Sequence, residues 1–282
     1  MARLPLSPTA VWGVVKELRM TAGDLHPLLV AGAPEHAATI HAAFAEGGHP
    51  DAVRDLSGRP PSAYDLEGAA VLVYAIDGAG PSEEDEKALR LAARKRVEVV
   101  CILVGVPAGE LPSVPDVLDT DVVAVAPGAP LPLETIVERV AERAGDSGHH
   151  LAARIPALRP AVVEEIVKRF SLQNGVLGVA IFIPGADFPV LTLNQIRMVL
   201  HIASAHGEEL DRERAFEVLS VVAAGLGFRA VARQFVGIVP GFGWAVKGGI
   251  AYAATRAVGE AASAYFAAGG TRLIRGSVRS RS

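Results

Sequence analysis

The chain has 282 residues, half of them apolar, with aromatic residues at only 5% and a mean hydropathy of +0.33. This length permits two domains, each with its own core. The single cysteine, Cys101, excludes an internal disulfide and favours a reducing compartment. Residues 1–20 lack the apolar core and cleavage site of a secretory signal, so we expect a cytoplasmic location.

The net charge of −4 hides an asymmetry between the two halves of the chain. Residues 1–150 hold 12 Lys and Arg against 22 Asp and Glu, a net charge of −10, and residues 151–282 hold 15 against 9, a net charge of +6. A basic and apolar half suits an anionic surface. The alternative is that the two halves attract each other.

The N-terminal half alternates helical patterns with short apolar runs. Helices are predicted over residues 8–20, 35–46, 82–96 and 133–144, and strands over residues 28–31, 52–56, 69–76, 97–104 and 121–126. Ser82 is the expected N-cap of its helix, with Asp85 three residues later. Continuous apolar strands separated by helices predict a small doubly wound parallel sheet of GTPase or flavodoxin type.

The C-terminal half has a helical pattern with a rough internal duplication. The pairs Pro184-Gly185 and Pro240-Gly241, 56 residues apart, each follow an apolar helical stretch. Because proline lacks an amide donor and glycine accepts positive φ, each pair ends one helix and reverses the chain. Two hydrophobic helical hairpins are therefore predicted, residues 161–182 with 188–206 and residues 212–238 with 244–268, which together form a bundle.

These patterns predict an α/β domain followed by an all-α domain. The expected divisions are an N-terminal helix over residues 1–23, the α/β domain over 24–145, a polar linker over 146–160, the helical-hairpin domain over 161–268 and a basic tail over 269–282.

The loop after the first predicted strand lacks the residues that bind nucleotide phosphates. A P-loop has Gly-x-x-x-x-Gly-Lys-Ser/Thr, whose amides and lysine hold the phosphates and whose hydroxyl binds magnesium. The segment in this register keeps Gly32 and Thr39, but Ala37 replaces the second glycine and Ala38 replaces the lysine. We therefore interpret it as a degenerate P-loop remnant and expect no bound cofactor.

Other motifs are equally incomplete. Residues 105–108 are Gly-Val-Pro-Ala where a GTPase carries the Asn-Lys-x-Asp that reads guanine, and Asp65 to Gly68 matches Asp-x-x-Gly only by chance. Asp77, after the third strand, is a candidate for magnesium binding or for a turn, and His149 with His150 has no clear ligand partner. The sequence predicts neither a catalytic residue nor a metal site.

A family likeness is carried by residues 182–200 (Phe-Ile-Pro-Gly-Ala-Asp-Phe-Pro-Val-Leu-Thr-Leu-Asn-Gln-Ile-Arg-Met-Val-Leu), 225–233 (Gly-Leu-Gly-Phe-Arg-Ala-Val-Ala-Arg) and 239–244 (Val-Pro-Gly-Phe-Gly-Trp). Through these strings, residues 160–268 resemble the YcjF-type domain of unknown function that is attached to bacterial GTPases. The resemblance implies a GTPase-like domain before it, here a pseudo-GTPase, and a link to the membrane.

The predicted hairpins favour contact with a membrane surface over spanning. A spanning helix needs ~20 apolar residues, whereas the longest charge-free run, residues 170–186, has 17. Aromatic side chains at the turns and basic side chains on the helices and tail suit the headgroup region. The expected membrane or partner contacts are Phe188, Phe242, Trp244, Arg197, Arg229, Arg233, Lys247, Arg272 and Arg275.

The sequence thus predicts a non-catalytic scaffold or regulator, not an enzyme, that lies peripherally on the inner face of the cell membrane and binds anionic lipid or a protein partner but no nucleic acid. Two alternatives stay open. One is a soluble oligomeric assembly or interaction protein, and the other is a weak nucleotide-binding, GTPase-like protein.

Overall fold

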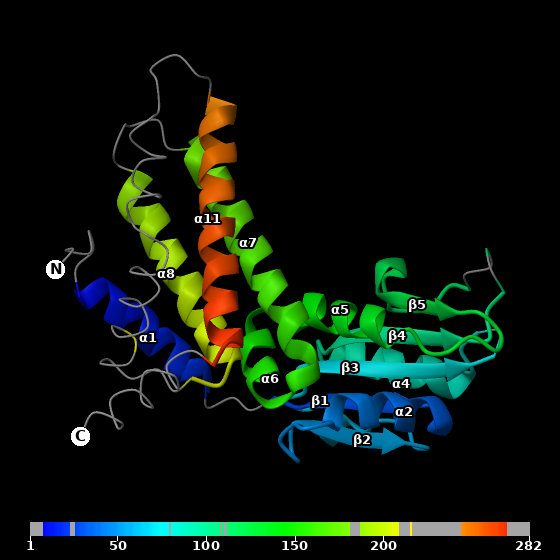
Figure 1. The fold of residues 1–282 in the computed structure, drawn as a ribbon. Coiled ribbons are helices and arrows are strands. Elements are labelled where there is room, and N and C mark those ends of the chain that lie inside the picture. The colour runs from blue at the N-terminus through cyan, green and yellow to red at the C-terminus, as the bar shows by residue number, and fades with distance from the viewer. Residues whose placement is uncertain are drawn as a thin grey trace. The chain divides into compact units, whose positions relative to one another are not determined.

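The computed structural model describes residues 8–22, 26–78, 80–107, 109, 112–180, 187–208, 215 and 244–269 (Figure 1). The chain forms two compact units. The α/β unit comprises residues 23–162, and the helical unit comprises residues 1–22 together with residues 163–282.

The α/β unit is built on five parallel strands, which confirms the predicted parallel sheet. They are β1 (Leu28–Gly32), β2 (Val53–Ser57), β3 (Val71–Asp77), β4 (Glu98–Val104) and β5 (Val122–Val125). Their order is β2-β1-β3-β4-β5 (Figure 1). Leu28 lies between Val53 of β2 and Val71 of β3, so β1 is an interior strand. Its apolar sequence, Leu-Leu-Val-Ala-Gly, suits a strand that is buried on both faces.

Helices cover both faces of this sheet. They are α2 (Pro34–Ala45), α3 (Ala63–Leu66), α4 (Glu83–Arg94) and α5 (Leu133–Ala144), and the β4–β5 connection carries only the 3-10 helix η1 (Asp119–Asp121). Leu29, Tyr74 and Leu103 form one core cluster with Leu66 of α3 and Leu89 of α4. Because side chains alternate along a strand, the residues between them face α2 and α5, which contact the same strands.

The segment predicted as a polar linker is helical and belongs to the α/β unit. It forms η2 (Gly145–Ser147), α6 (Gly148–Arg154) and η3 (Pro156–Leu158). Leu151, Ile155 and Leu158 are almost completely buried. The linker prediction over residues 146–160 was therefore wrong, because these three residues recur at helical spacing and pack into the core.

The helical unit contains α1 (Pro8–Ala22), α7 (Arg159–Ala180), α8 (Asp187–Ala205) and α11 (Trp244–Ala267), with the boundary between the units falling after Val162 of α7. A helical C-terminal region is thus confirmed, whereas the helix predicted over residues 212–238 lies outside the described residues except for Ala215. α1 packs on α8, and the Arg197 guanidinium of α8 lies 3.3 Å from the Glu17 carboxylate of α1.

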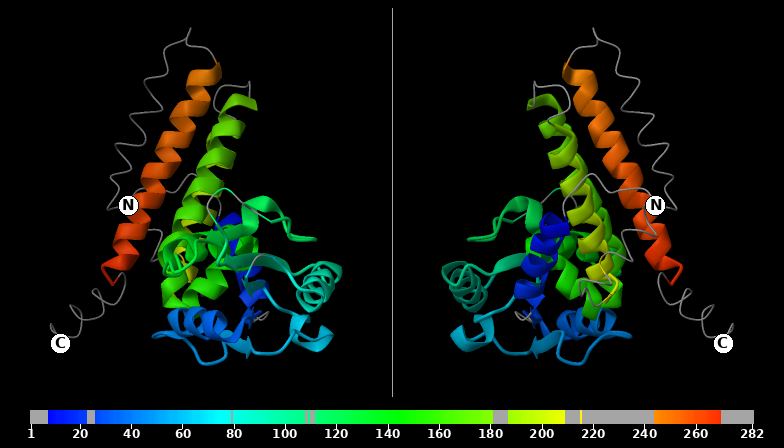
Figure 2. Two further views of the ribbon diagram at one scale, coloured as in Figure 1. Left: turned by 90° about the vertical axis from the view of Figure 1, so that its right-hand side faces the viewer. Right: turned by 90° about the vertical axis from the view of Figure 1, so that its left-hand side faces the viewer.

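α7 and α11 lie side by side and approach closely at glycines (Figures 1 and 2). A Cβ on Gly248 would lie 2.8 Å from the carbonyl oxygen of Gly175, and a Cβ on Gly259 would lie 2.7 Å from a methyl group of Val167. Gly248 and Gly259 are three helical turns apart, so they lie on one face of α11. Larger side chains at these positions would force the two helices apart.

Two adjacent glycines of α11 test this packing. Gly248→Ala should lower the free energy of unfolding by roughly 1–3 kcal/mol, because the new methyl group overpacks the contact with α7. Gly249→Ala should raise it by roughly 0.5–1 kcal/mol, because alanine favours a helix and nothing lies within 4 Å of that position. Urea unfolding followed by circular dichroism measures both changes, and equal effects at the two positions would contradict the close approach.

Candidate functional site

The carboxyl edge of the sheet, where β1 and β3 meet, is the candidate site. In open parallel sheets ligands bind in the crevice at the point where the strand order reverses, which here is the β1–β3 boundary. A cavity of about 210 Å³ opens there, which we call the edge cavity. Its walls are Gly32, Pro34, Gly58, Arg59, Pro60, Tyr74, Glu84 and Asp85.

The turn from β1 into α2 is too short to form a phosphate-binding loop. Only Ala33 separates the end of β1 from the start of α2 at Pro34, and proline is favoured at the first helical position. The Ala33 amide donates to the carbonyl oxygen of Ala75 at 2.8 Å, and the Ala37 amide donates to the carbonyl oxygen of Ala33 at 2.9 Å. These two amides are therefore committed to the backbone structure.

Gly32 is required by a close backbone contact. It has a φ of +99°, and a Cβ there would overlap the carbonyl oxygen of Ala75 on β3. The glycine that matches the P-loop pattern thus allows β1 and β3 to pass side by side into their turns.

The other remnant positions do not converge on one point. Ala37 is fully buried in α2, and Ala38 is exposed. The Thr39 hydroxyl donates to the carbonyl oxygen of Glu35 at 3.0 Å, within the helix. Because residues 34–45 are helical, the hydroxyl that would bind magnesium in a P-loop is used along α2 instead.

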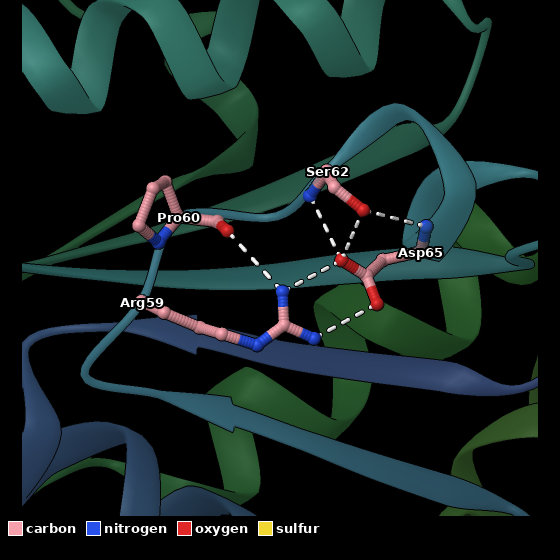
Figure 3. Close-up of polar contacts among 4 residues, drawn as sticks. All are labelled: Arg59, Pro60, Ser62 and Asp65. Atoms are coloured by element: carbon pink, nitrogen blue, oxygen red, sulfur yellow. Dashed lines mark hydrogen bonds and ion pairs between the residues drawn. The ribbon is translucent and has the colours of Figure 1, made fainter.

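Arg59, at the rim of the edge cavity, is held by Asp65 (Figure 3). Nη1 of Arg59 donates to Oδ2 of Asp65 at 2.7 Å and Nη2 donates to Oδ1 at 2.9 Å, a bidentate pair. Asp65 also accepts from the amide and hydroxyl of Ser62, at 2.8 and 2.6 Å. The Arg59 guanidinium, with these Ser62 bonds, holds the pKa of Asp65 well below its usual range.

A capping box stands at the start of α4, where Ser82 is the N-cap expected from the sequence. The hydroxyl of Ser82 accepts from the Asp85 amide, and Asp85 accepts from the Ser82 amide at 2.8 Å. The Tyr74 hydroxyl donates to Oδ1 of Asp85 at 2.9 Å. Burial, together with this carboxylate, raises the pKa of Tyr74 well above its ordinary value, so the phenol stays protonated.

The edge cavity is poorly suited to a polyphosphate. The positive charge of Arg59 is matched by Asp65, while Glu84 and Asp85 place two further carboxylates on the wall. The whole α/β unit holds 11 Lys and Arg against 21 Asp and Glu, a net charge of −10. A triphosphate would therefore meet repulsion at this edge.

The remaining chemical candidates do not assemble into a reactive group. Asp77 at the end of β3 lies 3.9 Å from the His36 imidazole. His149 is buried and packs against His150, with ring centroids 3.9 Å apart and the ring planes tilted by 41°. Burial raises the pKa of the Cys101 thiol to about 12, which keeps it un-ionised and poorly nucleophilic. Within the described part of the chain, no group of three or more His, Cys, Asp and Glu side chains could hold a metal.

Most of the predicted membrane or partner contacts lie beyond what the structure describes. Phe242, Arg229, Arg233, Arg272 and Arg275 fall outside the described residues, as do the side chains of Phe188, Trp244 and Lys247. Arg197 is described, and it pairs with Glu17. None of the described helices is long and apolar enough to cross a membrane.

Comparison with known proteins gives no match for this chain. No protein-family model matches the chain, and neither a curated protein nor a solved structure matches it.

The Asp65 contacts predict a pH dependence of stability. Asp65 has a lowered pKa in the folded state, so its contribution is present above the unfolded value of about 3.9 and is lost as the pH falls through the folded value. Asp65→Asn should cost about 1 kcal/mol at pH 7, a modest figure because Arg59 is half exposed. Urea unfolding of both proteins between pH 7 and pH 2 should show the difference shrinking below about pH 4.

Asp51→Asn provides the control, because that carboxylate is 86% exposed and lies no closer than 3.9 Å to His49. Its effect should be close to zero at every pH. A penalty for Asp65→Asn that stays constant down to pH 2 would contradict the ion-pair assignment.

Proposed function

We propose that this chain is a non-catalytic scaffold or regulator, a pseudo-GTPase whose helical unit associates with the surface of a membrane. The strand order β2-β1-β3-β4-β5 is that of flavodoxin-type doubly wound domains, which supports a nucleotide-binding type of architecture for the α/β unit. Membership of the YcjF-type family stays a prediction that rests on the sequence strings alone.

One observation carries the non-catalytic part of the proposal, the direct passage from β1 into α2. A P-loop acts through several free amides and a lysine that surround the phosphates. In this chain Pro34 has no amide, the Ala33 and Ala37 amides are bonded within the backbone, and Ala38 stands at the lysine position. The acidic wall of the edge cavity adds an electrostatic barrier beside the same turn.

Isothermal titration calorimetry with GTP and with ATP, each with magnesium, tests this part. The expected result is the absence of a saturable binding heat for either nucleotide at millimolar ligand. Saturable binding would contradict the proposal and support the alternative of a weak nucleotide-binding, GTPase-like protein.

The membrane part is supported by the way charge is distributed along the helical unit. The ion pair Arg256–Glu164 at 2.9 Å joins the second half of α11 to the first half of α7, and the ion pair Lys168–Glu165 at 2.8 Å lies within the first half of α7. The other end of these helices is almost free of charge. We call it the apolar end, and it comprises residues 170–180 of α7, 187–195 of α8 and 244–255 of α11, with Asp187 and Lys247 as its charged residues.

The exposed large apolar side chains of the described helical unit gather in the apolar end. Leu172 is 53% exposed, Val176 is 67% exposed and Val190 is 45% exposed. The α7 part has 11 residues and is about 16 Å long at 1.5 Å per residue. This is about half of the ~30 Å hydrocarbon core, a length that fits entry into one leaflet.

The net charge of the helical unit favours an anionic lipid surface. It holds 16 Lys and Arg against 10 Asp and Glu, a net charge of +6. Basic residues near a negative leaflet each contribute roughly 1 kcal/mol to binding. We therefore place the protein peripherally on the inner face of the cell membrane, with the α/β unit left in the cytoplasm to meet other proteins.

Flotation with phosphatidylcholine vesicles containing phosphatidylglycerol tests the membrane part. The wild-type chain should float, and Leu172→Glu with Val176→Glu should weaken binding by at least about tenfold, because the two side chains lose their transfer into lipid. Leu118→Glu is the control, since Leu118 is 62% exposed on the α/β unit and should not alter flotation.

A wild-type chain that stays in the aqueous fraction would contradict membrane association. If light scattering then gave a defined multiple of the 29.3 kDa chain, the result would support the soluble oligomeric alternative.

A further inference from the structure

Four buried or partly buried polar side chains join the three long helices inside the apolar end. Nδ2 of Asn174 on α7 donates to Oγ1 of Thr255 on α11 at 2.8 Å and to the carbonyl oxygen of Leu191 on α8 at 3.3 Å. Nδ2 of Asn194 donates to Oδ1 of Asn174 at 2.8 Å, and Nε2 of Gln195 donates to Oγ1 of Thr255 at 3.2 Å. We call Asn174, Asn194, Gln195 and Thr255 the polar layer.

The polar layer fixes how the helices fit together. Asn174 and Thr255 have no exposed surface, and both polar atoms of the Asn174 side chain, Nδ2 and Oδ1, are hydrogen-bonded. Sliding α11 by one turn would break the hydrogen bonds that Asn174 and Gln195 donate to Thr255, and losing them in an apolar surrounding is costly. The three helices therefore satisfy these groups only in the observed register.

The glycine contacts lie next to this layer. The carbonyl oxygen of Gly175, the neighbour of Asn174, faces Gly248 of α11, and Gly259 faces both Val167 of α7 and the sulfur of Met198 on α8. The unit therefore combines close backbone packing with hydrogen bonds across the helices.

These two interactions differ from apolar burial in one physical respect. In water, apolar burial drives helices together, but lipid chains are as apolar as the helix surfaces and supply no such force. Hydrogen bonds between helices and small-residue packing persist in lipid. A helical unit that has both can leave water without separating.

We propose that α7, α8 and α11 enter the membrane surface as one preassembled unit held together by the polar layer and the glycine contacts. This inference rests on the membrane association proposed above, and it adds that the helices do not splay apart when their apolar end meets lipid. The partner is the apolar interior of one leaflet, and the polar layer is a positioning device that sets the shape of the inserted part.

A disulfide probe reports whether α7 and α11 stay together. A Cβ on Gly175 would lie 3.4 Å from the Cβ of Tyr252, close to the mean separation of about 3.8 Å in disulfides. The full-length Gly175→Cys/Tyr252→Cys chain, with Cys101→Ala, should oxidise to the same extent in buffer and after flotation on the anionic vesicles. The Gly175→Cys/Ala253→Cys chain is the control, because Ala253 is exposed and should not cross-link.

Adding Asn174→Leu to the probe chain tests the polar layer itself. The cross-link should persist in buffer, where apolar burial holds the helices, and should fall by about threefold on vesicles, the factor that corresponds to one interhelical hydrogen bond of roughly 0.6 kcal/mol. Ser171→Ala is the matched variant, because the Ser171 hydroxyl is buried one turn away with no hydrogen-bond partner among the described residues. It should leave the cross-link unchanged in both settings.

The outcomes separate this inference from the proposed function. A probe chain that floats but loses its cross-link, or an Asn174→Leu chain that keeps the full cross-link on vesicles, overturns the inference and leaves membrane association standing. A chain that does not float overturns both.

Discussion

The backbone contact between the first and third strands determines what the α/β unit can do. The Ala33 amide is bonded to the carbonyl oxygen of Ala75, and Gly32 packs on the same oxygen, so the chain passes from β1 into α2 within one residue. A phosphate loop would need those amides free and several more residues of chain. The turn at the centre of this edge is thereby fixed, and the edge cavity, with Glu84 and Asp85 in its wall, lies beside it.

Polar side chains serve architecture in both units. In the α/β unit, Asp65 and Asp85 cap helices and bind Arg59 and Tyr74, so both carboxylates hold structure at the edge of the sheet. In the helical unit, Asn174 and Thr255 connect helices that apolar packing alone would leave free to slide. In both units these polar groups specify the shape of the fold.

The sequence predicted those features that depend on neighbouring residues. Apolar runs gave all five strands, and Ser82 with Asp85 gave the start of α4. The same Ser-x-x-Asp pattern occurs at Ser62 and Asp65 and indicates the start of α3. It overlaps the Asp-x-x-Gly match at residues 65–68, which drew attention to a different motif. α6 was missed because it is only seven residues long and begins with a glycine and two histidines, which are more typical of a polar loop. The edge cavity and the polar layer could not be predicted, because the latter joins residues as far as 81 positions apart.

The α/β unit is an insertion within the helical unit, since residues 1–22 and 163–282 together form the latter. The ion pair between Glu17 and Arg197 closes a separation of 180 residues. During synthesis α1 leaves the ribosome before the sheet, and α8 follows only after the sheet, so the sheet can fold while the apolar face of α1 has no partner helix. α1 therefore completes its packing only when α8 arrives.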